Sequence, residues 1–295
     1  MEPIRKEDLD QEIFDMYDYY VHGQINRREF VNRLSKYAVG GLTVSAIMAY
    51  LLPNYAEAKR YTPEDPRLIS EYLDYDSPNG GGKMKGLLSR PKDAKGKLPG
   101  ILVVHENRGL NPYVEDTAHQ AALDGFVAFA PDALAPLGGY PGTDDEGRTM
   151  QATRNRDEIL EDFIAGFELL KSHESCNGNV GVVGFCFGAW ISNMMAARRP
   201  DLKASVPFYG GQVGAEDAAK ITAPLQLHYA ELDTRVNAGW EAYEEALKAN
   251  GIDYEVYFYP GVNHGFHNHS TPRYDQPAAE LAWGRTIEFF KKHLG

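Results

Sequence analysis

Cysteine is scarce in this chain of 295 residues. The two cysteines, Cys176 and Cys186, can form at most one disulfide bond, which excludes a disulfide framework and favours a reducing compartment. Basic residues are also few: the chain has 30 Lys and Arg residues against 42 Asp and Glu residues, which gives a net charge of −12. A face that binds nucleic acid or an anionic membrane needs clustered basic side chains, so we expect neither as a partner.

Long apolar runs and metal-binding motifs are absent as well. The apolar run from Tyr37 to Leu52 is shorter than the roughly 20 residues that a helix needs to cross a bilayer, so we expect no stable membrane insertion. No H-E-x-x-H or C-x-x-C motif occurs, and the clustered histidines His264, His267 and His269 are expected to serve catalysis and loop contacts. We therefore predict no metal and no cofactor.

One pentapeptide organises the chain, Gly184-Phe185-Cys186-Phe187-Gly188. It follows the apolar run 179–183 and opens the helical segment 189–199, so a buried strand, a tight turn and a helix meet at Cys186. This pattern is the G-x-nucleophile-x-G elbow of the α/β-hydrolase fold, with cysteine in place of the usual serine. The alternative is a buried, inert cysteine beside a packing glycine, since free cysteine is among the most buried residue types.

The chain from residue 70 onward alternates strands and helices. Two short runs flank Pro78-Asn79-Gly80-Gly81-Gly82 and predict a β-hairpin. Further strands are expected at 98–105, 126–130, 179–183, 204–209, 225–229 and 254–259, helices at 113–124, 155–172, 239–250 and 280–293, and a Pro/Gly loop at 131–147. This alternation predicts an α/β-hydrolase fold, with a mostly parallel central sheet, helices on both faces and a helical N-terminal extension.

Two residues at later strand ends complete a candidate triad. In this fold the order along the chain is nucleophile, acid, histidine, and sites gather at the carboxyl ends of the strands. Asp233 follows the strand at 225–229, and His264 follows the strand at 254–259. We therefore predict a triad of Cys186, His264 and Asp233, with Glu231 as the alternative residue that orients the histidine.

The attacking form of a cysteine is its thiolate, and an ordinary thiol is mostly protonated at neutral pH. We expect His264 and the N-terminus of the helix beginning near Phe187 to favour the thiolate of Cys186. The oxyanion formed on attack needs two backbone N–H donors, which are predicted to be those of Phe187 and of Asn107 in the loop after the strand at 98–105.

Over roughly residues 70–294 the chain resembles the dienelactone hydrolase (carboxymethylenebutenolidase) family. The resemblance lies in the cysteine elbow, the acid and histidine loops in order, the stretch His-Glu-Asn-Arg-Gly-Leu at 105–110 and the stretch Phe-Tyr-Gly-Gly at 208–211. It implies that Glu106 pairs with the resting cysteine and takes part in its activation. The alternative for Glu106 is an ion pair with Arg108 that stabilises the loop.

The same resemblance implies arginines that bind a substrate carboxylate, one of them a few residues after the catalytic histidine. Here Gly265-Phe266-His267-Asn268-His269 follows His264, with no arginine before Arg273. The substrate-binding candidates are therefore Arg108, Tyr140, Arg148, Trp190 and Arg235. The expected function is hydrolysis of small esters or lactones through an acyl-cysteine. The alternatives are a general carboxylesterase or thioesterase, or a non-catalytic assembly module.

The first 60 residues differ in character from the rest. Ile13, Phe14, Met16 and Tyr17 are spaced like one face of a helix, and Arg27-Arg28 precedes an apolar run, as in a twin-arginine export signal. We expect a retained helical arm at 1–60 and a catalytic domain at 61–295, in the cytoplasm; the alternative is export to the periplasm. An arm that cannot bury its own apolar face is expected to build a homodimer.

Overall fold

A computed structural model describes residues 4–39, 42–62 and 65–295. Parts of the expected arm (residues 1–3 and 40–41) and of the expected start of the catalytic domain (63–64) lie outside the described residues. No helix in the described part of the chain is long and apolar enough to cross a membrane.

The catalytic domain is built on one sheet of eight strands, in the order β1-β2-β4-β3-β5-β6-β7-β8. Strands β1 and β2 form an antiparallel hairpin in which Leu68 pairs with Pro91, and β2 also pairs with β4 in the antiparallel sense. All other neighbours pair in parallel. The strands are β1 (Leu68–Ser77), β2 (Gly82–Pro91), β3 (Leu98–Val104), β4 (Val127–Pro131), β5 (Cys176–Phe185), β6 (Ala204–Phe208), β7 (Leu225–Ala230) and β8 (Tyr254–Tyr259).

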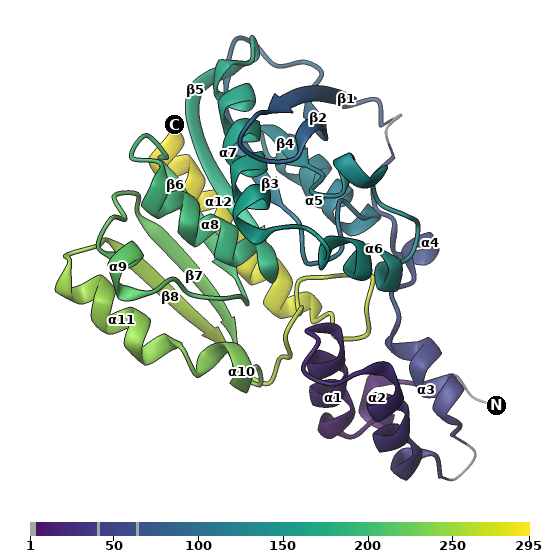
Figure 1. Ribbon diagram of the computed structural model, residues 1–295. Coiled ribbons are helices and arrows are strands. Elements are labelled where there is room, and N and C mark those ends of the chain that lie inside the picture. Colours follow the sequence, from purple (N-terminus) through teal and green to yellow (C-terminus); the bar gives the residue numbers. More distant parts are fainter. Residues whose placement is uncertain (1–3, 40–41, 63–64) are drawn as a thin grey trace.

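Helices cover both faces of this sheet, as the alternating pattern predicts (Figure 1). On one face α7 (Arg156–Ser172), α8 (Phe187–Arg198) and α11 (Trp240–Ala249) bury one apolar cluster. On the other face α5 (Pro112–Leu123) and α12 (Gln276–Leu294) bury a second cluster. The central strands β3 to β7 are buried between the two layers, which explains their continuous apolar runs.

The expected Pro/Gly loop at 131–147 is only partly irregular. It contains the 3-10 turn η3 (Ala135–Leu137) and leads into α6 (Asp144–Gln151). The side chain of Thr143 accepts a hydrogen bond from the backbone N–H of Glu146 and donates one to its carboxylate, which caps this helix. The expectation of a loop to residue 147 is therefore wrong at its end, because a Thr-x-x-Glu cap starts a helix there. Two short helices, α9 (Ala215–Ala218) and α10 (Thr234–Asn237), follow later strands.

The N-terminal arm is helical, as expected. It comprises η1 (Lys6–Asp8), α1 (Gln11–Val21), α2 (Arg27–Leu34), η2 (Ser35–Tyr37), α3 (Val44–Leu51) and α4 (Tyr55–Ala58). The apolar side chains of α1, α2 and α3 bury one another in a cluster of their own, near α6 and α10 in Figure 1. Because the arm buries its face within the same chain, burial does not require a second copy, and the homodimer stays a prediction.

The Arg pair lies in the first turn of α2. Asn26 is the N-cap of α2, and its side chain accepts a hydrogen bond of 3.0 Å from the backbone N–H of Glu29. Arg27 and Arg28 are exposed in the first turn of this helix. Export through a twin-arginine route stays a prediction.

Candidate active site

Cys186 sits on a strained turn between β5 and α8. Its backbone has φ 55° and ψ −109°, an unusual conformation for a residue with a side chain. The neighbouring glycines make the turn possible, since a side chain on Gly184 would collide with the carbonyl oxygen of Gly188, and one on Gly188 would lie 2.8 Å from that of His105. Cys186 is only 7% exposed. The geometry is that of a nucleophile elbow.

His264 and Asp233 meet at the carboxyl edge of the sheet. The Nδ1 of His264 lies 2.6 Å from Oδ2 of Asp233, and both side chains are buried. The other oxygen, Oδ1, accepts a hydrogen bond from the backbone N–H of Val236 and caps α10. Glu231, the alternative orienting residue, is exposed and accepts a hydrogen bond from the Gly261 N–H instead. Asp233, not Glu231, is therefore the carboxylate that contacts His264.

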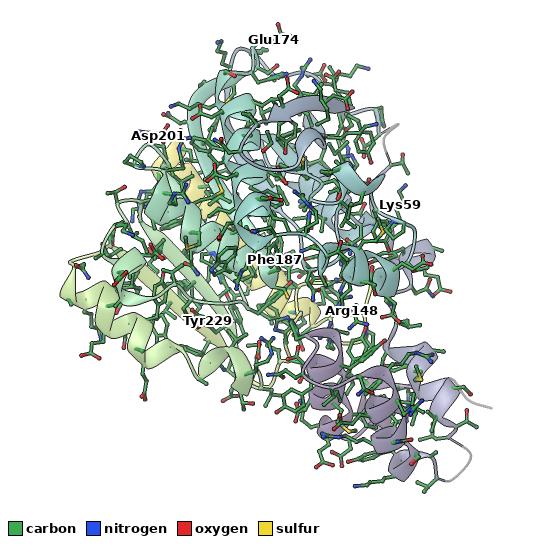
Figure 2. The ribbon with its side chains drawn as sticks, viewed as in Figure 1. Lys59, Arg148, Glu174, Phe187, Asp201 and Tyr229 are labelled. Carbon is green, nitrogen blue, oxygen red and sulfur yellow. The ribbon has the colours of Figure 1, made fainter. Side chains whose placement is uncertain are left out.

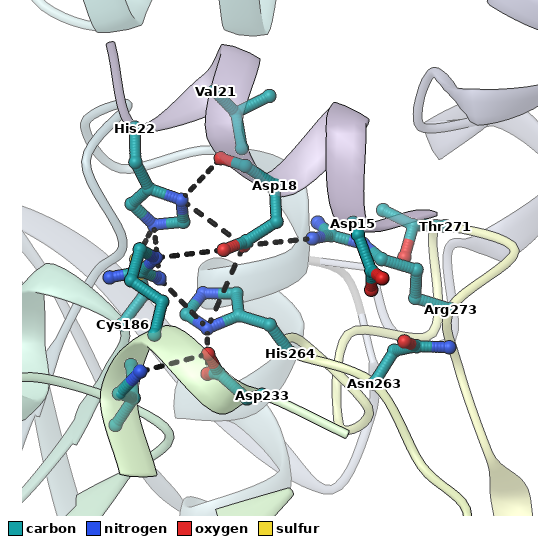
Figure 3. A network of polar contacts seen from close by, with 12 residues as sticks. Asp15, Asp18, Val21, His22, Cys186, Asp233, Asn263, His264, Thr271 and Arg273 are labelled. Carbon is teal, nitrogen blue, oxygen red and sulfur yellow. Dashed lines mark hydrogen bonds and ion pairs between the residues drawn. The ribbon is translucent and has the colours of Figure 1, made fainter. Parts of the chain in front are cut away.

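A second histidine, from the arm, contacts the cysteine. The Nε2 of His22, directly after α1, lies 3.2 Å from Sγ of Cys186 (Figure 3). Its Nδ1 lies 2.8 Å from the backbone oxygen of Asp18 and 3.1 Å from the Asp18 carboxylate. The rings of His22 and His264 meet edge to face, with centroids 4.7 Å apart. A ring nitrogen of His264 lies within 4.8 Å of Sγ, but no hydrogen bond joins these two described side chains.

Asp18 ties the arm to the catalytic domain. Its Oδ2 accepts a hydrogen bond of 2.8 Å from Nε of Arg235, and its Oδ1 lies 3.8 Å from Nη1 of Arg273. Burial raises the pKa of the Asp18 carboxyl, but its interactions with His264, His22 and Arg235 outweigh burial and hold this pKa well below its usual range. Asp18 is thus a buried carboxylate that faces one arginine and two histidines.

The sequence-based prediction missed both Asp18 and His22. The available signal was their spacing of four residues at the end of a predicted helix, which places two side chains on one face. That spacing indicates a local pair and says nothing about Cys186.

The predicted oxyanion donors lie beside the elbow and the arm. Phe187 is the first residue of α8, so its N–H has no acceptor within the helix. Asn107 lies in the loop after β3, and its side-chain Nδ2 donates a hydrogen bond of 2.9 Å to the backbone oxygen of Val21 in the arm. The arm therefore contacts the loop after β3 as well as the thiol.

Glu106 is placed differently from both expectations. Its side chain is buried, and Oε2 accepts a hydrogen bond of 3.0 Å from Nδ2 of Asn268. Among the described side chains neither Cys186 nor Arg108 forms a hydrogen bond or ion pair with it. Arg108 pairs instead with Asp144, at 2.5 Å. Both expected partners of Glu106 are thus corrected, because Asn268 satisfies the carboxylate and Asp144 neutralises the arginine.

The substrate-binding candidates separate into three kinds. Arg108 and Tyr140 bond to the Asp144 carboxylate and serve the loop. Trp190 stacks under the guanidinium of Arg156, 3.5 Å from its ring centre. The other two candidates, Arg148 and Arg235, contact the arm.

Of these, Arg148 donates to the backbone oxygen of Tyr20 at 3.0 Å, where the arm meets α6 (Figure 2). Arg235 alone among the five contacts both histidines, with Nη2 lying 3.3 Å from Nε2 of His22 and 3.3 Å from Nδ1 of His264.

Two groups of possible metal ligands cluster at the site. Their ligand atoms lie within 4.8 Å of one another, and the groups are His22 with Cys186 and His264, and Asp18 with Asp233 and His264. Hydrogen bonds and ion pairs within the protein already engage these side chains, so we describe them as a hydrogen-bonded network. The absence of a metal and of a cofactor stays a prediction.

The sheet order and the elbow define an α/β-hydrolase fold with cysteine at the nucleophile position. A family model described as the dienelactone hydrolase family matches residues 84–294, and a second, described as YqhI-like, matches residues 1–39. The chain belongs to the dienelactone hydrolase family. This match confirms the family resemblance of the sequence. It also confirms that the protein is a hydrolase that acts on ester or lactone bonds.

Known relatives cover most of the chain. The protein named usf from Aquifex pyrophilus is 38% identical over 226 residues, 72% of this chain and 95% of that protein. A protein of Escherichia coli O157:H7, provisionally named a carboxymethylenebutenolidase, is 30% identical over 249 residues, 79% of this chain and 90% of that protein. A crystal structure of a provisional dienelactone hydrolase from Klebsiella pneumoniae superposes with a TM-score of 0.67 at 25% identity, covering 76% of this chain and 99% of that one.

Proposed function

We propose that this protein hydrolyses small esters or lactones through a covalent acyl-cysteine on Cys186. The observation that supports this most is the strained elbow at Cys186, on the same sheet edge as the bonded pair of His264 and Asp233. Sγ attacks the acyl carbon, and the N–H groups of Phe187 and Asn107 stabilise the oxyanion. His264, oriented by Asp233, then removes a proton from the water that hydrolyses the acyl-enzyme.

The two cysteines provide the test. Cys186→Ala should abolish hydrolysis of p-nitrophenyl acetate and the acyl adduct seen by mass spectrometry. Cys176→Ala is the matched control, because Cys176 is also buried but lies at the opposite end of β5. Turnover by Cys186→Ala at the wild-type rate would refute the nucleophile.

The alternatives within this proposal concern the acyl group and catalysis itself. A general carboxylesterase or thioesterase would turn over linear esters or thioesters faster than lactones in a matched substrate panel. A non-catalytic assembly module would leave Cys186 unreactive toward iodoacetamide.

Assembly and location belong to the same proposal. We place the division between arm and catalytic domain near residue 60, and a homodimer through the arm is supported by its exposed apolar side chains Val39 and Leu52. An unchanged mass in light scattering after Val39→Ser and Leu52→Ser would count against that dimer. Cytoplasmic location, with periplasmic export as the alternative, is tested by cell fractionation and by the N-terminal sequence of the purified protein.

A further inference from the structure

The arm brings a second imidazole to the reacting sulfur. We propose that His22 is a catalytic residue that takes the thiol proton of Cys186 in the resting enzyme, while His264 and Asp233 serve hydrolysis of the acyl-enzyme. This inference rests on the function proposed above. It assigns a chemical role to a residue outside the catalytic domain.

The contacts of His22 fix its tautomer. Nδ1 faces two oxygens of Asp18, at 2.8 Å and 3.1 Å, so in the neutral ring this nitrogen carries the proton and donates it. The lone pair of Nε2 then faces Sγ of Cys186 at 3.2 Å, within reach for proton transfer. Asp18 acts here as a positioning residue, because its backbone oxygen accepts the Nδ1–H and its carboxylate lies 3.1 Å from the same nitrogen.

Charges on every side of His22 bear on this proton. Asp18 on α1 and Cys186 at the elbow favour the protonated, positively charged His22 ring. Arg235 on α10, whose Nη2 lies 3.3 Å from Nε2 of His22, and the neighbouring His264 ring disfavour it. Burial lowers the pKa of His22, but the charges of Cys186 and Asp18 outweigh it and raise this pKa above its ordinary value. The guanidinium of Arg235 and the neutral phenol of Tyr209 also lie near Cys186.

Hydrogen bonds to the catalytic domain hold the arm directly before His22 and at the start of α1. Before His22, the backbone oxygens of Tyr20 and Val21 accept hydrogen bonds from Arg148 and Asn107 of the catalytic domain. At the start of α1, Gln11 bonds to the side chain of Asn263, the residue before His264. The YqhI-like match ends at residue 39 and so contains Asp18 and His22, whereas the dienelactone hydrolase match contains Cys186. The site is thus assembled from two separately recognised segments.

The proton transfers balance as follows. The S–H bond of Cys186 breaks, its proton moves to Nε2 of His22, and the electron pair stays on Sγ. Sγ then bonds to the acyl carbon, and the C=O electron pair moves to the oxyanion. When the oxyanion collapses, the bond to the leaving oxygen breaks, and that oxygen takes the proton from His22. Water next attacks the acyl group, and His264 takes the water proton and returns it to the departing Sγ.

Removal of the His22 imidazole should slow acylation, which is the first half of the reaction. In a Cys176→Ala background, His22→Gln should slow the alkylation of Cys186 by iodoacetamide at pH 7 by about tenfold or more. It should slow the p-nitrophenyl acetate burst by at least ~10-fold and leave deacylation unchanged. His264→Gln should slow deacylation, and His293→Gln, half-buried on α12, should match the wild type.

A second measurement keeps the arm unaltered. The ring-proton NMR signal of His22, assigned by its loss in His22→Gln, is titrated in the wild type and in Cys186→Ala. The His22 pKa should fall when the thiol is removed; equal pKa values would overturn the proposal, as would a burst rate in His22→Gln within twofold of the wild type. Retained hydrolysis by Cys186→Ala would instead refute the proposed function, so the two failures are distinguishable.

Discussion

We expect the ion pair between Asp18 and Arg235 to hold α1 against the catalytic domain. The carboxylate is 11% exposed and its partner Arg235 is 24% exposed, so solvent screens the pair only in part. A hydrogen bond to a charged group contributes about 1.5–3 kcal/mol, and an exposed ion pair less than about 1 kcal/mol. For Asp18→Asn, which keeps the shape and removes the charge, we expect a loss of about 2 kcal/mol, or roughly a 30-fold increase in undocked arm.

Amide hydrogen exchange measures this opening segment by segment. In Asp18→Asn the amides of α1 should exchange roughly 30-fold faster, while those of α12 stay unchanged. Asp15→Asn is the matched control, since Asp15 lies on the same helix, loses the same charge and bonds only to Gln11 among the described side chains. If exchange in α1 changed by less than threefold, or equally in both variants, the pair with Arg235 would not hold the arm.

Three further outcomes follow from the site. Gly188→Ala should lower the free energy of unfolding by about 1–3 kcal/mol in denaturant titrations, because the added methyl group would collide with the last carbonyl oxygen of β3. Gly284 has open space around it, so Gly284→Ala should leave the free energy of unfolding unreduced. Asp233→Asn should reduce kcat on the order of 10²–10⁴-fold, since the His264 tautomer is no longer fixed; a loss below threefold would contradict this role. Because the pKa of Asp18 is depressed on docking, its stabilisation of the arm is full above the unfolded pKa of about 4 and is lost progressively as pH falls from there through the depressed pKa of the docked state. Proteolysis of the arm should therefore be faster at pH 3 than at pH 7, because part of this stabilisation is already lost at pH 3. Equal cleavage at both pH values by an acid-stable protease, after correction for its activity, would argue against it.

Much of the catalytic domain could be predicted because its signals are local. Parallel strands buried on both faces must be continuous apolar runs, and the elbow needs glycines around one residue with positive φ. The order of acid and histidine follows from the fold, which is why Asp233 and His264 could be paired from sequence. The partners of Glu106 could not, because Asn268 lies 162 residues away and no local pattern connects them.

The position of the arm on the catalytic domain could not be predicted from local sequence patterns. Its helices follow from apolar spacing and from caps such as Asn26, but the surface on which they dock depends on pairs far apart in the chain. Asp18 and Arg235 are separated by 217 residues, and His22 and Cys186 by 164. An acidic, aromatic helix would fit many surfaces, so its sequence alone does not say which one it covers.

The docked arm also bears on which substrates reach the sulfur. Asp18 already accepts the Nε–H of Arg235, the candidate arginine that contacts His264. The first arginine after His264, Arg273, is buried with its guanidinium 3.8 Å from the same carboxylate. A carboxylate on an ester would compete with Asp18 for these guanidinium groups, so it reaches them only by displacing α1, whereas a neutral ester or lactone meets no such competition. We therefore expect the docked arm to favour neutral acyl groups over anionic ones.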